Sequence, residues 1–142
     1  MSAMSFREKS AWISFVSIAL VFSVYFARIL RLLPAAWLRG NAFQLFLLLV
    51  ASLVVLEVVL HLAIAIRSPR DARTPKDERE RLIDMKATRV AFPVLLVGTF
   101  AAIGTLHLPT SRWDMAHVML LALVVTELTR FGAQIVYHRR GF

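Results

Sequence analysis

The sequence contains no cysteine and comparatively little charge. Without cysteine, the chain has no disulfide bond, no thiolate ligand for zinc or an iron–sulfur cluster, and no thiol nucleophile. Charged residues make up 18% of the 142 residues and hydrophobic residues 58%, whereas soluble domains have about 25% charged and about 45–50% apolar residues. This balance excludes an ordinary soluble domain and indicates a membrane protein. The sequence also lacks a nucleophile paired with a base and a glycine-rich phosphate-binding loop, so we expect no enzymatic activity.

Long apolar stretches predict an all-α membrane protein with four transmembrane helices. A hydrocarbon core of about 30 Å requires roughly 20 apolar residues of helix. The sequence has four such stretches, at residues 11–33, 42–66, 88–108 and 115–136. Short connections group them into two helical hairpins, about 5–67 and 88–140, within a single four-helix transmembrane domain. A cytoplasmic linker and helix, about 68–89, joins the hairpins.

The distribution of Lys and Arg predicts the orientation in the bilayer. Eight of them lie within residues 67–89, and others flank the first and last apolar stretches, on the same side of the membrane. The positive-inside rule assigns this side to the cytoplasm. We therefore expect a multi-pass protein of the bacterial inner (cytoplasmic) membrane, with both termini cytoplasmic. The net charge of +8 is explained by orientation and by anionic lipid, so we expect no nucleic-acid partner.

An internal repeat relates the two hairpins. Residues 53–57 (LVVLE) and 123–127 (LVVTE) agree at four of five positions, and the glutamate is shared. Leucine and valine recur by chance in any span, but an ionisable residue in the membrane costs about 2.5–3.5 kcal/mol and is rarely incidental. The repeat predicts that the hairpins are duplicated and have the same orientation.

Helix-start signals precede both hairpins. Ser5 and Glu8 have the spacing of a capping box, in which each side chain accepts a hydrogen bond from the other residue's backbone N–H. Thr74 and Pro75 form the second signal, with threonine as the N-cap and proline at the first helical position. We therefore expect a helix from about 74 to 89 that continues into the third span.

The third span is expected to pack closely against a neighbouring helix. Gly98 and Gly104, with Ala101 and Ala102 between them, give it a face of small side chains. Such faces allow close approach of helix backbones in membranes.

The charged run before the third span, residues 77–89 (DERERLIDMKATR), resembles a segment of small uncharacterised bacterial inner-membrane proteins. Those proteins have four predicted spans and a DERE-like run before the third. The resemblance implies this layout and brings no known activity. Some members of similar families are membrane partners of transcription regulators. This resemblance implies a docking role for the charged helix.

The first functional hypothesis is therefore an interaction or regulatory subunit that docks a cytoplasmic protein partner through helix 74–89. The candidate docking residues are Asp77, Glu78, Glu80, Arg81 and Asp84. The alternative for this segment is a solvated face whose charges only support the helix.

Two glutamates inside the spans support a second hypothesis. Glu57 has His61 one turn toward the cytoplasm, and Glu127 has Arg130 in a similar position. These residues either fix helix packing through polar contacts or make the chain a small proton-coupled transporter, working as a homodimer. The structural role is the simpler interpretation.

Histidines suggest a third function, a haem-binding membrane subunit. His61 and His138 lie toward the cytoplasmic ends of their spans, and His107 and His117 toward the outer ends. No span carries two well-separated histidines, which makes axial haem ligation a weak hypothesis. A divalent metal held by His107, Asp114 and His117 is equally weak, because Asp114 could simply be the N-cap of the fourth span. We expect no cofactor.

Overall fold

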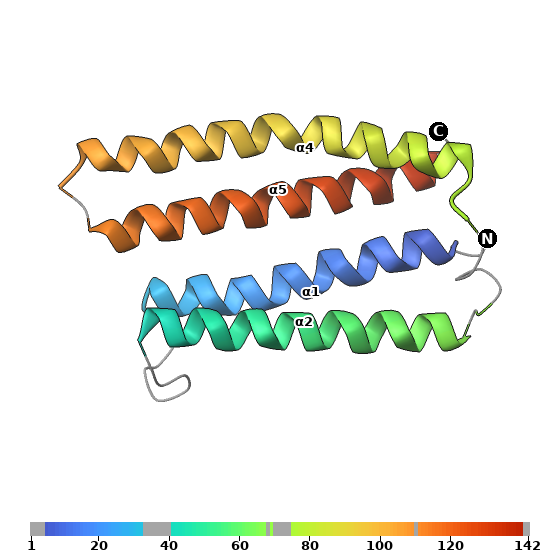
Figure 1. The fold of residues 1–142 in the computed structure, drawn as a ribbon, viewed down its shortest axis with the longest axis horizontal. Helices are drawn as coiled ribbons and strands as arrows, with labels where there is room; N and C mark the ends of the chain where they lie inside the picture. The colour runs from blue at the N-terminus through green and yellow to red at the C-terminus, as the bar shows by residue number, and fades with distance from the viewer. Residues whose placement is uncertain (1–4, 33–40, 68, 70–74, 110, 141–142) are drawn as a thin grey trace. The chain divides into compact units, whose positions relative to one another are not determined.

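The computed structural model describes residues 5–32, 41–67, 69, 75–109 and 111–140, with the side chain of residue 42 excepted. In this part of the chain it has four long helices and one 3-10 turn (Figure 1): α1 (Phe6–Ile29), α2 (Ala42–Arg67), α4 (Glu78–Gly104), η1 (Thr105–His107) and α5 (Arg112–Arg140). Each long helix is long and apolar enough to cross a membrane. The prediction of an all-helical chain with four helices able to span a membrane is confirmed in this respect.

The chain divides into two compact units, Met1–Thr74 and Pro75–Phe142. In the first unit α1 packs against α2, and in the second α4 packs against α5 (Figure 1). Each unit is thus an antiparallel pair of helices. Whether one pair arose by duplication of the other stays a prediction.

The charged segment before the third span is the beginning of α4. The helix runs without a break from Glu78 to Gly104, so the predicted linker helix and the third span are one element. Thr74 lies outside the described residues, and its prediction as the N-cap is wrong because Asp77 has this role. The Asp77 carboxylate accepts a hydrogen bond from the Glu78 N–H at 2.7 Å, and Glu80 Oε2 accepts one from the Asp77 N–H at 3.3 Å. This capping box satisfies backbone groups that Thr74 was expected to serve.

The first helix starts as predicted and ends earlier than predicted. Ser5 is the N-cap, and its Oγ accepts a hydrogen bond from the Glu8 N–H at 3.1 Å. The helix ends at Ile29 because Arg31 adopts a left-handed conformation, with φ of 59°. The Leu32 N–H then donates to the Ala27 carbonyl at 2.8 Å, which satisfies a terminal carbonyl of the helix. The expected span to residue 33 is therefore too long.

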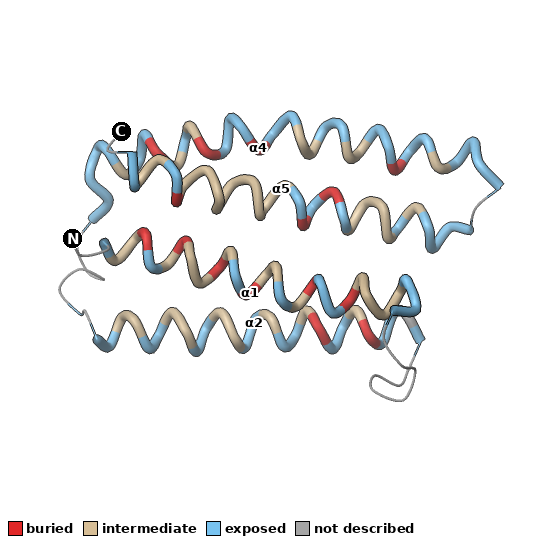
Figure 2. Tube along the Cα trace, turned by 180° about the vertical axis from the view of Figure 1, so that it is seen from behind, coloured by how far each residue is buried: buried red, intermediate tan, exposed pale blue. Residues whose placement is uncertain are grey.

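In the first unit, α1 presents a mixed polar and aromatic face to α2. Its buried residues recur at intervals of three positions, with one interval of five (Figure 2); after Glu8 they are Ala11, Ser14, Ser17, Phe22 and Tyr25. Tyr25 meets Phe46 of α2 edge-on, with 6.4 Å between ring centroids. Among the described side chains of α2, Leu45 and Leu49 are buried. Large side chains thus fill one end of this helix pair, and serines lie toward the other.

In the second unit, alanines and one glycine bring α4 and α5 into close contact. The buried residues of α4 are Ile83, Ala87, Ala91 and Ala102. A Cβ atom added at Gly98 would lie 3.2 Å from the Ala122 Cα on α5 and would collide with the Ala122 Cβ. The predicted close approach is confirmed at Gly98. Gly104 is not part of it, because a Cβ there would meet nothing within 4 Å.

Replacing Gly98 by alanine should therefore destabilise the second unit by about 1–3 kcal/mol, the usual cost of overpacking. Gly104→Ala is the matched control and should leave stability unchanged or raise it slightly, because alanine favours helix. Thermal unfolding in detergent micelles, followed by tryptophan fluorescence, measures both. Equal unfolding temperatures for the two variants would contradict the close contact.

Candidate functional site

Four polar side chains form a cluster between α1 and α2, here called the Glu57 cluster: Ser10, Ser14, Glu57 and His61. Ser14 Oγ donates a hydrogen bond to Glu57 Oε2 at 2.9 Å. One turn away, Ser10 Oγ and His61 Nε2 are 2.8 Å apart. The two serines are four residues apart on α1, and Glu57 and His61 are four residues apart on α2. The antiparallel helices therefore meet in two successive polar contacts. The cluster thus connects the middle of α2 with the beginning of α1.

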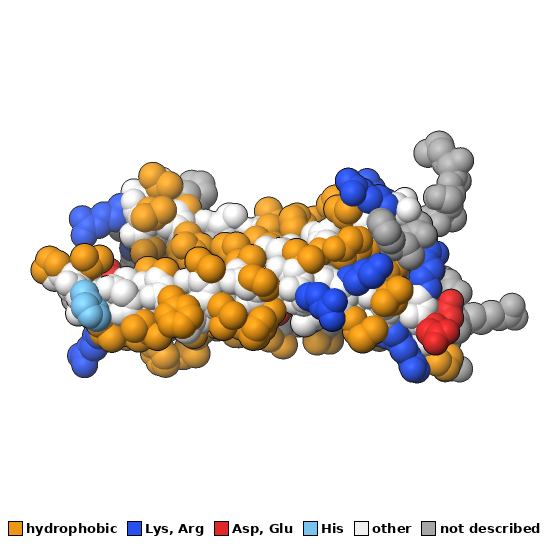
Figure 3. Space-filling model, turned by 90° about the horizontal axis from the view of Figure 1, so that it is seen from above, with side chains coloured by type: hydrophobic (Ala, Val, Ile, Leu, Met, Phe, Trp, Pro, Cys, Tyr) orange, Lys and Arg blue, Asp and Glu red, His pale blue; other side chains and the backbone are white. Residues whose placement is uncertain are grey.

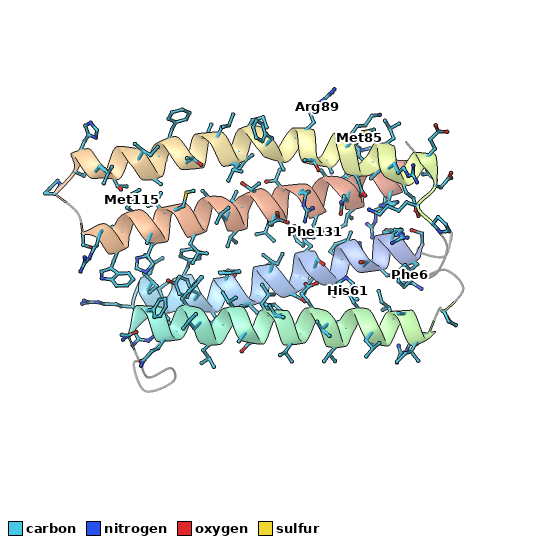
Figure 4. The ribbon with its side chains drawn as sticks, viewed as in Figure 1. Phe6, His61, Met85, Arg89, Met115 and Phe131 are labelled. Carbon is cyan, nitrogen blue, oxygen red and sulfur yellow. The ribbon has the colours of Figure 1, made fainter. Side chains whose placement is uncertain are left out.

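His61 also contacts Glu57 on its own helix. Its Nδ1 lies 3.2 Å from Glu57 Oε2 and 2.8 Å from the Glu57 carbonyl oxygen. Figure 4 shows the labelled His61 side chain between α1 and α2. When Nδ1 carries the proton, Nε2 accepts from the Ser10 hydroxyl; an imidazolium would instead donate from both nitrogens. Both ring nitrogens are therefore engaged, and use of His61 as a haem ligand would require breaking one of these contacts.

The second carboxyl oxygen of Glu57 is the unsatisfied atom of the cluster. Glu57 Oε1 is buried and has no hydrogen-bond partner among the described residues, and the side chain is 24% exposed. A buried polar oxygen without a partner is costly, and more so when it carries charge. A proton on Oε1 would give a neutral carboxylic acid while Oε2 keeps the hydrogen bond from Ser14. Oε1 is thus the open position for a proton or a cation.

Glu127 has a different environment from Glu57. It pairs on its own helix with Arg130, whose Nη2 lies 2.5 Å from Glu127 Oε2. The Arg130 guanidinium also lies 4.6 Å from the centroid of the Phe131 ring, a cation–π contact. The carboxylate of Glu127 is therefore balanced by a permanent charge, whereas Glu57 has hydroxyl and imidazole neighbours. The two glutamates of the sequence repeat are not equivalent sites.

The structure separates the predicted docking residues into two groups. Asp84 is used within the unit, because its Oδ1 accepts a hydrogen bond from Gln134 Nε2 of α5 at 3.0 Å and its Oδ2 pairs with Lys76. Asp77 and Glu80 form the capping box. Glu78 and Arg81 are exposed on the first turns of α4.

In the part of the chain that the structure describes, no group of three or more possible metal ligands is found, so His107, Asp114 and His117 are not brought together as such a group. The alternative interpretation of Asp114, as the N-cap of the fourth span, is wrong because Asp114 lies in the first turn of α5. Its Oδ2 accepts hydrogen bonds from the Ser111 N–H at 2.7 Å and from the Ser111 hydroxyl at 2.9 Å, and α5 begins at Arg112. Ser111 thus precedes the helix, and Asp114 reaches back to it from the first turn.

The comparison with known families supports the membrane assignment. A sequence model of the family described as "Predicted membrane protein (DUF2178)" matches residues 9–142. The chain belongs to this family. No curated protein and no solved structure matches the chain. The DUF2178 match thus agrees with the expected resemblance to uncharacterised membrane proteins, and it assigns no activity to the Glu57 cluster.

Sequence reasoning missed two of the four residues of this cluster in the DUF2178 chain. Glu57 and His61 stand out because they are ionisable within an apolar span. Ser10 and Ser14 do not, because serine is common near the ends of membrane helices. The available signal is their spacing: serines four residues apart on one helix match Glu57 and His61 four apart on an antiparallel partner.

The contact between Ser14 and Glu57 should be measurable as a coupling energy. In a double-mutant cycle of Ser14→Ala and Glu57→Ala, the two effects on unfolding free energy should be non-additive by roughly 0.6–1.7 kcal/mol, the range for interhelical hydrogen bonds in membranes. Ser52→Ala is the control, because Ser52 Oγ donates to the Leu48 carbonyl of its own helix at 2.8 Å. Coupling of Glu57 to Ser52 as large as to Ser14 would contradict the assigned contact.

Proposed function

We propose that the chain is a small, non-enzymatic proton-coupled transporter of the bacterial inner membrane, with Glu57 as the group that binds the proton. The observation that supports this proposal is the position of Glu57. One of its oxygens is held by Ser14 and His61, and the other is buried without a partner among the described residues. An ionisable group within a membrane span is a functional candidate by default.

The chemistry follows from competition at one carboxyl group. As a carboxylate, Glu57 attracts a cation, and the organic cations that suit a partly buried site are weakly hydrated. When Glu57 takes up a proton at Oε1, it becomes neutral and the cation loses its counter-charge. Binding of a proton and of a cation are then mutually exclusive, which is the requirement for exchange. Ser14 and His61 hold Oε2 in both states.

Glu127 is not expected to take part in this exchange. A proton or an external cation would have to displace Arg130 from Glu127, which would leave a partly exposed guanidinium without its counter-charge. The proposal therefore relies on Glu57 alone within each chain. A homodimer would bring two such sites together and would enlarge the narrow interior that four spans provide.

The proposed orientation places the Glu57 cluster toward the cytoplasm. With both termini cytoplasmic, Arg67 marks the inner end of α2, and Glu57 lies about 15 Å further into the membrane at 1.5 Å per residue. Ser10 and His61 then lie between Glu57 and the cytoplasmic surface. This order offers hydroxyl and imidazole groups along the route of a proton.

Transport should depend on Glu57 and not on Glu127. Protein reconstituted in liposomes with an imposed pH gradient should accumulate guanidinium or tetraphenylphosphonium, and Glu57→Gln should abolish this pH-driven uptake because the amide cannot exchange a proton. Glu127→Gln, the same change in the other hairpin, should retain most of the flux. Absence of pH-driven uptake of both cations by the wild type, or full activity of Glu57→Gln, would contradict the proposal.

A second candidate function is docking of a cytoplasmic protein through the start of α4. The supporting observation is that Glu78, Arg81, Leu82 and Met85 are exposed, while the capping box and the contact of Asp84 with Gln134 hold this part of the helix in place. Exposed apolar groups next to charges suit a protein partner. This would make the chain an interaction or regulatory subunit.

Docking is tested by exchanging two exposed charges. Glu78→Arg combined with Arg81→Glu keeps the net charge and spares the capping box. A protein that co-purifies with the wild type from native membranes in mild detergent should be lost from this variant by at least about tenfold, and Glu57→Gln should retain it. Equal recovery of the same protein with the exchanged charges would exclude this face as the docking site.

A further inference from the structure

A shallow groove lies on α4 just where the charged part of the helix meets its apolar part. It is lined by Asp84, Met85, Thr88, Arg89, Phe92 and Pro93. All six residues belong to one face of α4. Figure 4 shows the labelled Met85 and Arg89 side chains pointing away from α5. The groove therefore lies mainly on a side of α4 away from α5, with Asp84, which contacts Gln134 of α5, at its edge.

Arg89 is the free charge of this groove. The carboxylate of Asp84, the groove's acidic member, is already engaged by Gln134 and Lys76. No described side chain forms an ion pair with Arg89, which is exposed. The Thr88 hydroxyl donates to the Asp84 carbonyl at 2.9 Å, so it leaves Arg89 as the available side-chain donor. The lining residues carry one negative and one positive charge, and Lys76 from outside the groove balances the negative one. The charge left for a ligand is therefore the Arg89 guanidinium, a planar, multidentate donor.

Pro93 adds a backbone acceptor beside this charge. Proline has no N–H, so the carbonyl oxygen of Arg89, four residues earlier, cannot receive the usual helical hydrogen bond. A polar ligand with an anionic group and a neighbouring hydroxyl would satisfy both features: the anion at the guanidinium and the hydroxyl at the carbonyl.

An exposed apolar strip continues from the groove along the same helix. It consists of Phe92, Leu96, Val97 and Phe100, and Phe100 is 71% exposed. Figure 3 looks onto α4 and shows hydrophobic side chains along its middle, with Lys and Arg side chains toward its N-terminal end. From Arg89 to Phe100 the helix rises about 16 Å, which is about half of a hydrocarbon core of about 30 Å. The strip therefore matches one leaflet in length.

We propose that this groove binds the phosphate headgroup of an anionic phospholipid from the adjoining leaflet, with Arg89 on the phosphate and an acyl chain along Phe92 and Phe100. Phosphatidylglycerol has the required chemistry, a phosphodiester next to free hydroxyls. Charge complementarity favours it over a zwitterionic lipid, and the apolar strip favours a lipid over free phosphate. The site is independent of the Glu57 cluster.

The test is lipid binding to the delipidated full-length protein in a neutral detergent. Dioleoylphosphatidylglycerol should bind more tightly than dioleoylphosphatidylcholine, as counted by native mass spectrometry across a lipid titration. Arg89→Gln should weaken phosphatidylglycerol binding by at least about tenfold, as expected for loss of a charge-assisted hydrogen bond. Arg89→Lys should lose less, because it keeps the charge. Arg81→Gln removes the same charge from the same helix outside the groove and should change binding about twofold or less.

Several results would overturn the assignment. Equal losses in Arg89→Gln and Arg81→Gln would indicate diffuse attraction instead of a site. Displacement of the lipid by inorganic phosphate at matching concentration would indicate a free-phosphate site. Circular dichroism verifies that the variants fold, and a photoactivatable phosphatidylglycerol gives a second measurement on the wild type: its crosslinks should fall on residues 85–100, and crosslinks spread equally over α2 would contradict the site.

Discussion

The constraint on which this structure depends is that backbone N–H and C=O groups in hydrocarbon must be hydrogen-bonded within the protein. A chain with four long apolar stretches and 18% charged residues meets it by forming four helices. Once the backbone is satisfied in this way, apolar side chains give little preference for one helix rotation over another, because lipid tails are as apolar as leucine. The few polar and the few very small side chains therefore decide how the helices face each other.

The two units meet this requirement by different means. In the first, hydrogen bonds from α1 to Glu57 and His61 fix the rotation of two helices that otherwise contact through serine and aromatic residues. In the second, the contact of Gly98 with Ala122 brings the backbones together, and Asp84 with Gln134 fixes the end of the pair. Polar contacts leave an atom that can bind something else, whereas close packing does not. Glu57 Oε1 is such an atom, whereas Glu127 is not the candidate site because its carboxylate is paired with Arg130.

The sequence predicted the number, type and approximate positions of the spans, since hydropathy over 18 or more residues is a strong signal. Helix ends were less predictable. Thr74 and Asp77 are both plausible N-cap residues. Asp77 has a glutamate, Glu80, three positions later and so completes a capping box. The early end of α1 depends on the left-handed backbone conformation of Arg31. This conformation is usual for glycine and not for arginine, so the sequence gives no signal for it. Ser10 and Ser14 were missed because their role exists only once an antiparallel partner aligns them with His61 and Glu57.

The repeat of LVVLE and LVVTE shows how the same local sequence acquires different chemistry from its surroundings. Each glutamate has a basic residue about one turn later, an imidazole four positions after Glu57 and a guanidinium three positions after Glu127. On α1, Ser14 provides Glu57 with a neutral donor, so the charge of this carboxyl group is not balanced by a permanent cation. On α5, Arg130 provides the balancing charge directly. In the register of the repeat, His61 aligns with Phe131 and Arg130 aligns with Leu60, so the two basic partners come from different positions. The surroundings of each glutamate, and not the repeated residues, therefore set its chemistry.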